Sequence, residues 1–271
     1  MTRQPGRLGT PCPTNDRRGG DFGRSGTACP TYLVLALVFA QAAQAAPTGL
    51  LNDTGQTSCY DAADTAVACD VAGVGGDAGV NPRQDARFGR DAKNAAGTLS
   101  KIGGGAAGFD FTKICWNGDA EGSGTCTGTL VANTSATASG TASTDWACTK
   151  DNVTNLVWSL ETISGVDWFA ATDSGAGSSS KAYNDASRCG FATGWRVPTR
   201  RELLSIVHYG ATSPAIDGNY FPATQSNAYW SSDSCAGFLA DAWVVFFNGG
   251  GGVAGYDRAG QYFVRLVRSG P

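Results

Sequence analysis

The sequence lacks the residues and spacings of the common metal sites. It has one histidine, His208, and no C-x-x-C pair among its nine cysteines. Zinc sites draw on Cys and His at close spacings, so we expect no zinc site. The D-x-D-x-D run typical of calcium loops is also absent. We therefore expect no metal and no cofactor, and we interpret the scattered aspartates of the C-terminal half as surface carboxylates: Asp145, Asp151, Asp167, Asp173 and Asp185.

The chain also lacks an apolar run long enough to cross a membrane, which takes about 20 residues. Residues 31–46 read TYLVLALVFAQAAQAA, an apolar core that ends in small residues at A-x-A spacing, and five arginines precede it. This pattern predicts a secretory signal peptide over residues 1–46, cleaved between Ala42 and Pro47, and no transmembrane anchor. We expect an exported protein, in the periplasm, on the cell surface or secreted.

Charge is scarce and leans acidic. Charged residues make up 16% of the chain, and its net charge is −3. Loss of residues 1–46 removes five Arg and two Asp, which changes the net charge to −6. An acidic surface opposes binding to nucleic acid. A surface glycan or a protein is the expected partner, and the oligomeric state stays open.

Seven cysteines follow the predicted signal peptide, and in an exported chain we expect them to form disulfides. The candidates are Cys59, Cys69, Cys115, Cys126, Cys148, Cys189 and Cys235. Because seven is odd, at least one is free or pairs between chains. The first four favour two short local pairs, 59 with 69 and 115 with 126. Cys189 then has two candidate partners, Cys148 and Cys235.

The chain divides by composition into three parts. Residues 47–144 form a Gly-rich region that ends in a low-complexity Ala/Ser/Thr segment over 131–144, and residues 145–271 form the main domain. Apolar patterns predict strands over 109–116, 156–159, 229–232, 242–247 and 261–268, and a turn over 151–155. Helices are expected near 168, over 181–189 and over 199–209. The last begins at a T-x-x-E capping box, Thr199 and Glu202, and stops at Gly210.

Seven segments, in order, resemble the Lcl C-terminal-domain family: LNDTGQTSCYD (51–61), GGGAAGFDFTK (103–113), DNVTNLVW (151–158), CGFATGWRVPTRREL (189–203), SPAIDGNYFP (213–222), YWSS (229–232) and YFVRLVR (262–268). The resemblance implies an α+β, C-type-lectin-like fold, with two helices packed on a twisted antiparallel sheet and long loops. Residues 189–203 are also similar to formylglycine-generating enzymes. Those enzymes need a copper-binding Cys pair near the C-terminus, whereas the last cysteine here is Cys235, so we do not expect their activity.

No catalytic constellation is evident, and we expect a protein that is not an enzyme. Ser205 lies one turn before His208, but a triad also needs an orienting carboxylate and an oxyanion hole. We interpret His208 as a structural residue in the last turn of the helix. Arg196, Arg200 and Arg201 either bind an acidic glycan or are paired and solvated.

Three tryptophans are candidates for a sugar-stacking platform. Trp195 and Trp243 are expected in the core, and Trp230 is the best candidate for partial exposure. The segment 233–261 resembles the C-terminal loops of retroelement-diversified lectin-like proteins, although we favour an ordinary Gly-rich hairpin loop, because loops tolerate Gly. Under the first interpretation its ligand face is Asp233, Phe238, Asp241, Asn248, Tyr256 and Asp257.

The expected function is therefore an exported binding protein, surface adhesin-like or glycan- or protein-binding. The alternatives are a structural envelope protein without a ligand and a retroelement-diversified variable protein.

Overall fold

The computed structural model describes residues 52–61, 63, 65–67, 69, 84–135, 145–173, 175 and 178–271. All of them belong to one compact unit, Ala43–Pro271. The predicted signal peptide lies outside the described residues, and so do residues 136–144 of the low-complexity segment. Within the described ranges, no helix is both long enough and apolar enough to span a bilayer.

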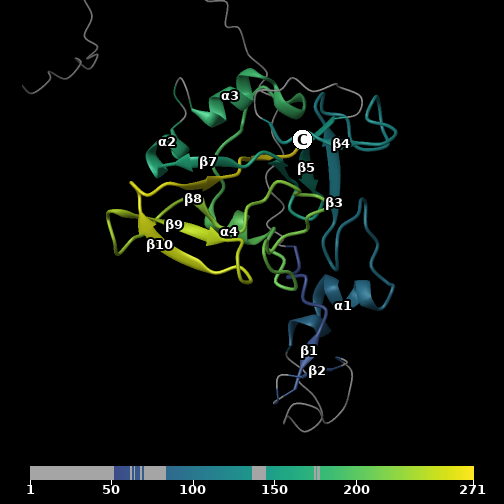
Figure 1. Cartoon of the computed structure of the whole chain (residues 1–271). Coiled ribbons are helices and arrows are strands. Elements are labelled where there is room, and N and C mark those ends of the chain that lie inside the picture. Colours follow the sequence, from purple (N-terminus) through teal and green to yellow (C-terminus); the bar gives the residue numbers. More distant parts are fainter. Residues whose placement is uncertain are drawn as a thin grey trace, which may run out of the picture. The chain divides into compact units, whose positions relative to one another are not determined.

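The described residues form an α+β structure in which sheets predominate, as expected (Figure 1). The helices are short: α1 Gly89–Ala95, α2 Trp168–Thr172, α3 Ser179–Asp185 and α4 Arg200–Leu204. A two-stranded sheet, β1 Cys59–Tyr60 and β2 Ala66–Val67, precedes α1.

The first large sheet carries the candidate site. Its order is β10-β9-β8-β11-β7, and its strands are β7 Ile163–Val166, β8 Ala228–Ser234, β9 Asp241–Phe246, β10 Val253–Asp257 and β11 Tyr262–Val264. The predicted strands at 229–232 and 242–247 are confirmed. The sheet is not wholly antiparallel, because β8 and β11 run parallel. Within the described residues β10 is an outer strand that pairs only with β9.

The second large sheet joins the N-terminal region to the main domain. Its order is β12-β6-β5-β3, with β4 also on β5, and its strands are β3 Phe111–Cys115, β4 Val131–Ala132, β5 Asp145–Asp151, β6 Leu156–Ser159 and β12 Val267–Ser269. The turn between β5 and β6 forms as predicted, since the carboxylate of Asp151 accepts the N–H groups of Val153 and Thr154.

The prediction of one strand over 261–268 is wrong. The segment forms β11 and then β12, which belong to different sheets. Between them Arg265 is fully buried, and its guanidinium donates to the carbonyls of Ser159 and Leu160. Burying a guanidinium costs free energy unless it forms hydrogen bonds. The bonds of Arg265 to Ser159 and Leu160 therefore fix the chain where it crosses from one sheet to the other.

Two predicted helices are shorter than expected. α4 ends at Leu204, because the N–H of His208 bonds to the carbonyl of Ala215 instead of continuing the helix. α3 ends at Asp185, and the chain then takes positive φ at Ser187 and Cys189, which no helix accommodates. The short helix at 168 is confirmed as α2.

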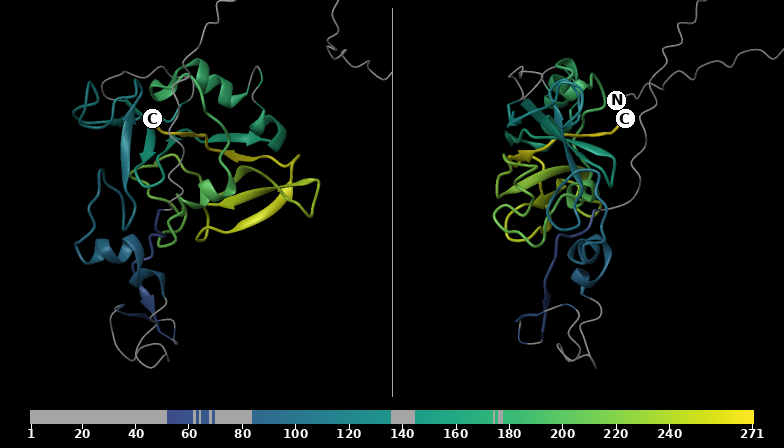
Figure 2. Two further views of the ribbon diagram at one scale, coloured as in Figure 1. Left: turned by 180° about the vertical axis from the view of Figure 1, so that it is seen from behind. Right: turned by 90° about the vertical axis from the view of Figure 1, so that its right-hand side faces the viewer.

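The central strands β8 and β9 of the first sheet have buried residues on both faces. Trp230 of β8 and Val244 of β9 pack in one cluster with Ala171 of α2, whereas Tyr229 and Val245 pack in another. Leu203 of α4 belongs to this second cluster. Alternating residues of a strand point to opposite faces, so α2 and α4 cover opposite sides of the sheet, as Figures 1 and 2 show.

Three disulfides connect the described residues: Cys59–Cys69, Cys115–Cys126 and Cys148–Cys189. Both predicted local pairs are confirmed, and Cys189 pairs with Cys148. Cys235 is the free cysteine of the described part, and it is buried.

Candidate ligand-binding site

The start of α4 is fixed by its own side chains. Thr199 Oγ1 accepts the Glu202 N–H at 3.2 Å, and the Glu202 carboxylate accepts the Thr199 N–H at 2.7 Å, which confirms the predicted capping box. The Arg200 N–H donates to Asp233 of β8 at 2.7 Å. These bonds hold the helix start against the sheet and so determine where Arg196 and Arg200 lie.

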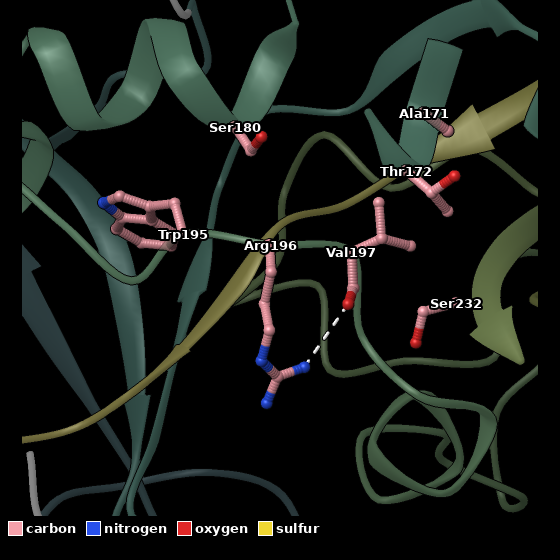
Figure 3. Close-up of a pocket in the computed structure, with 7 residues that line it drawn as sticks. All are labelled: Ala171, Thr172, Ser180, Trp195, Arg196, Val197 and Ser232. Atoms are coloured by element: carbon pink, nitrogen blue, oxygen red, sulfur yellow. Dashed lines mark hydrogen bonds between the residues drawn. The ribbon is translucent and has the colours of Figure 1, made fainter. Parts of the chain in front are cut away.

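Arg196 is held by protein groups. Its two terminal nitrogens donate to the two Glu202 carboxylate oxygens at 2.6 and 2.8 Å. Burial alone would raise the pKa of Glu202, but the hydrogen bonds and charge of Arg196, with the bonds from Thr199, hold it below its usual range. Figure 3 shows Arg196 also directed to the carbonyl of Val197, beside a cavity of about 180 Å³. Three of its five N–H donors are thus used within the protein.

Arg200 has no such partner. Its guanidinium carbon lies 4.5 Å from the centre of the Trp243 ring. Among the described residues no carboxylate pairs with it, and its guanidinium forms no hydrogen bond, although its backbone N–H donates to Asp233. The side chain is half-buried. A guanidinium stacked on an aromatic ring keeps its in-plane donors available for a carboxylate or phosphate.

The Arg200 guanidinium borders a cavity of about 500 Å³ between the start of α4 and the β9–β10 hairpin. We call this space the Arg200 cavity; it is lined by Arg200, Ser234, Cys235, Ala236, Gly237, Phe238, Asp241, Trp243 and Gly255. Phe238 is 70% exposed, and the adjacent Leu239 is 87% exposed. The cavity thus combines aromatic walls with one cation and one carboxylate, a common composition of ligand sites.

Cys235, which is buried, is one of the residues that line this cavity. Burial raises the pKa of its thiol, and the nearby charge of Asp241 adds to the rise. A thiol is nucleophilic only as thiolate, so this group is a poor nucleophile at neutral pH.

The predicted exposures of two tryptophans are wrong. Trp230 is fully buried, and its Nε1 donates to the carbonyl of Val166 at 2.9 Å. Trp243 is only half-buried and lines the Arg200 cavity. The reason is strand pairing: Trp243 lies opposite Gly255 of β10, which has no side chain to cover its ring. Trp195 is buried as expected, against Tyr183.

The other residues of the predicted ligand face lie on different sides of the β9–β10 hairpin. Asp241 lines the Arg200 cavity, and Asp257 lies directly across the strand pair from it. Tyr256 points to the other face, where its ring packs on Phe246 and Tyr262. Asn248 is exposed in the turn after β9, away from the cavity lining. The structure therefore unites only part of the predicted ligand face.

Ser205 and His208 form hydrogen bonds with other groups and not with each other. Ser205 donates its hydroxyl to the carbonyl of Glu202 at 2.7 Å, and His208 Nδ1 accepts the N–H of Gly210. The predicted place of His208 in the last turn of the helix is wrong: its ring packs near Phe109 and against Gly55, beyond the end of α4.

An acidic cluster in the N-terminal region escaped the sequence analysis. Asp53, Asp85 and Asp91 each place a carboxylate oxygen within 4.8 Å of the others, a set that could hold a cation. Burial raises the pKa of Asp91, against the effect of a bond from Gly108 N–H, and the charge of Asp53 raises it further. The three residues are widely spaced in the sequence, so no local motif announces them.

A comparison with protein families gives one match. Residues 147–268 match the Lcl C-terminal domain. The matched segment covers less than half of the 271-residue chain. None of the curated proteins matches the chain. The residues that line the Arg200 cavity all lie within the matched residues 147–268, whereas the acidic cluster precedes them.

Proposed function

We propose that the chain is an exported, non-enzymatic binding protein, adhesin-like at the cell surface, whose Lcl C-terminal domain has a C-type-lectin-like fold. Its ligand, a glycan or a protein, places an anionic group against Arg200. The observation that carries this proposal is the half-buried Arg200 guanidinium, stacked on Trp243 at the edge of a cavity and without a carboxylate partner among the described residues.

The energetic argument concerns a partly desolvated charge. Removing a guanidinium from water costs free energy, which an ion pair normally offsets. Arg196 has such a pair, with Glu202, whereas no described residue forms one with Arg200. A ligand carboxylate that accepts hydrogen bonds from two N–H groups of the Arg200 guanidinium would provide this ion pair. Such charge-assisted hydrogen bonds are roughly twice as strong as neutral ones.

Two further features support parts of the proposal. Three disulfides favour an oxidising compartment and hence export. The separate hydrogen bonds of Ser205 and His208, and the raised pKa of the Cys235 thiol, favour a binding role over catalysis.

The test uses Arg200→Gln, with Arg201→Gln as the matched control, because Arg201 is exposed on the same helix. The purified protein and both variants are applied to one array of carboxylated glycans, neutral glycans and acidic peptides. Binding to carboxylated probes should persist in the control and fall by about tenfold or more in Arg200→Gln. Equal binding by both variants, or blank arrays throughout, would contradict the proposal, and blank arrays would favour a structural envelope protein.

A further inference from the structure

The outer edge of β10 is open for pairing. The Phe246 N–H bonds to the Gly252 carbonyl, and the Arg258 N–H bonds to the Ala240 carbonyl. In an antiparallel pair such bonded positions alternate. Ala254 and Tyr256 therefore bond to β9, while the backbone N–H and C=O groups of Val253 and Gly255 point outward, where no other described strand lies.

This edge lacks the devices that usually protect one. Natural edge strands carry Lys, Pro, inward charges or bulges that prevent pairing with another chain. β10 reads Val-Ala-Gly-Tyr-Asp, pairs with β9 without a bulge, and has Val253 44% exposed. Its only charge is Asp257, at the end of the strand.

The Arg200 cavity opens beside the middle of this edge. Gly255 lines the cavity, and a Cβ added to it would lie 2.9 Å from the Cys235 sulfur. Directly paired residues of neighbouring strands point to the same face. A strand added about 4.8 Å outside β10 would thus direct the side chain opposite Gly255 toward the face of Trp243 and Arg200.

Charge on this face selects the occupant. No anionic group of the described residues pairs with the Arg200 guanidinium, and two residues along β10 from Gly255, Asp257 is paired with Asp241 in the strand register. No cation among the described residues forms an ion pair with either. Opposed like charges destabilise a strand pair. The Asp241 carboxylate also reaches Gly255, since one of its oxygens would lie 3.5 Å from a Cβ added there. The face therefore presents an unpaired positive charge together with two unpaired carboxylates, all within two residues along the strand.

We infer that the partner of this site is an extended peptide segment of another protein, which adds a strand to β10. It places an acidic side chain opposite Gly255, at Arg200, and a basic side chain two residues away, at Asp257 and Asp241. Main-chain bonds to Val253 and Gly255 supply affinity, and the two charged side chains fix the register. The inference rests on the proposed function and narrows its ligand from glycan or protein to peptide.

In an antiparallel addition, the residue opposite Asp257 comes two positions before the residue opposite Gly255. The probe is therefore a synthetic peptide, Ac-Thr-Val-Thr-Lys-Thr-Glu-Thr-Val-Thr-amide, titrated against the full-length protein by calorimetry. Replacing its Glu by Gln should weaken binding about tenfold, because a charge-assisted bidentate pair is lost. Replacing its Lys by Gln should weaken binding about threefold. Equal affinity for all three peptides would overturn the assignment of the charged side chains.

Methylation of the peptide backbone tests strand addition itself. Single N-methyl groups are placed along the peptide in turn. Those on N–H groups that face β10 should weaken binding about tenfold, and those on the alternate N–H groups should have little effect. On binding, amide exchange should slow at Val253 and Gly255 and stay unchanged at Ala254 and Tyr256, which are already bonded. An N-methyl series without this period of two would overturn the inference.

A protein variant separates the edge from the cavity. Val253→Pro removes an outward N–H at the first position of an edge strand, where proline is tolerated, and Val253→Ala retains that N–H. The proline variant should bind the peptide about three- to tenfold more weakly than the alanine variant. If Val253→Pro binds normally while Arg200→Gln loses carboxylated glycans, peptide addition is wrong and the proposed function stands. If Arg200→Gln changes no probe, both fail.

Discussion

Arg196 and Arg200 lie four residues apart at the start of α4, and their guanidinium groups have different surroundings. Arg196 donates to both oxygens of Glu202, which in turn caps the helix through Thr199. Arg200 stacks on Trp243 and borders a cavity of about 500 Å³. One arginine is part of the device that starts a helix, and the other has its planar donors available.

Trp230 and Trp243 differ in the same way. Trp230 is fully buried and donates to a backbone carbonyl, whereas Trp243 shows part of its ring to the cavity beside Gly255. Residues whose polar atoms are satisfied inside the protein contribute to folding. Residues with polar or aromatic surface left over are the ones through which a ligand can gain free energy. Substitutions of Arg196 and Trp230 should therefore change stability, and substitutions of Arg200 and Trp243 should change binding.

The largest contrast should come from the two tryptophans. Trp230→Phe removes buried volume and leaves the Val166 carbonyl without its donor, so unfolding should require about 2–4 kcal/mol less. Trp243→Phe keeps an aromatic surface at a half-exposed position, and its cost should stay below about 1 kcal/mol. Urea denaturation of the two variants measures both values. Equal losses would mean that Trp243 supports the fold as Trp230 does.

The two arginines should differ by a smaller amount. Arg196→Gln leaves the mostly buried Glu202 carboxylate with only its bonds from Thr199, which should lower stability by about 1–2 kcal/mol. Arg200→Gln should change stability by less than about 0.5 kcal/mol, since its guanidinium pairs with no carboxylate of the described residues. The same denaturation experiment compares them, with Arg201→Gln as the surface reference. A larger loss for Arg200→Gln would reverse the assignment.

The sequence was sufficient for features that depend on neighbouring residues. The capping box, the turn at Asp151, the two local disulfides and the strand at 242–247 are confirmed, because each depends on spacings of a few residues. The resemblance over residues 189–203 and the other segments led to the matching family. The α+β class followed from it.

What the sequence could not supply depends on distant partners. Both Trp230 and Trp243 lie in apolar strands, and only the register with β10 reveals that Gly255 leaves one of them uncovered. The helix over 199–209 was overextended because Ile206 and Val207 continue its apolar pattern. They are buried after the chain has left the helix, where the His208 N–H bonds to Ala215. Arg196 and Arg200 are likewise indistinguishable in the sequence, because only the folded structure shows that Glu202 pairs with Arg196.

Thr199 provides a smaller test of the helix start that Arg196 and Arg200 share. Thr199→Ala removes the hydroxyl that accepts the Glu202 N–H, and N-cap losses of this kind cost about 1 kcal/mol. Thr199→Ser retains the cap and should recover most of the stability. Because a frayed first turn would also release Arg200 from its place over Trp243, binding of acidic probes should weaken together with stability. If stability falls while binding is unchanged, the cap does not position Arg200.

The smallest expected effect is a pH dependence confined to the Arg196 side. The folded pKa of Glu202 is lowered, so the unfolded chain binds this proton more readily than the folded protein does. The contribution of Glu202 is therefore complete above its unfolded pKa, about 4.3, and is lost as the pH falls through the folded value. The measurement is the difference in unfolding free energy between the wild type and Glu202→Gln, from pH 6 to about pH 3. This difference separates the contribution of Glu202 from that of the other carboxylates. It should shrink by less than about 1 kcal/mol on acidification. Arg200→Gln should leave that difference unchanged, whereas Arg196→Gln should reduce it, because Arg196 is the one of these two arginines that lowers the pKa of Glu202. If Arg196→Gln and Arg200→Gln alter this pH dependence equally, the two arginines are electrostatically coupled through the helix start. They could then not be assigned separate roles.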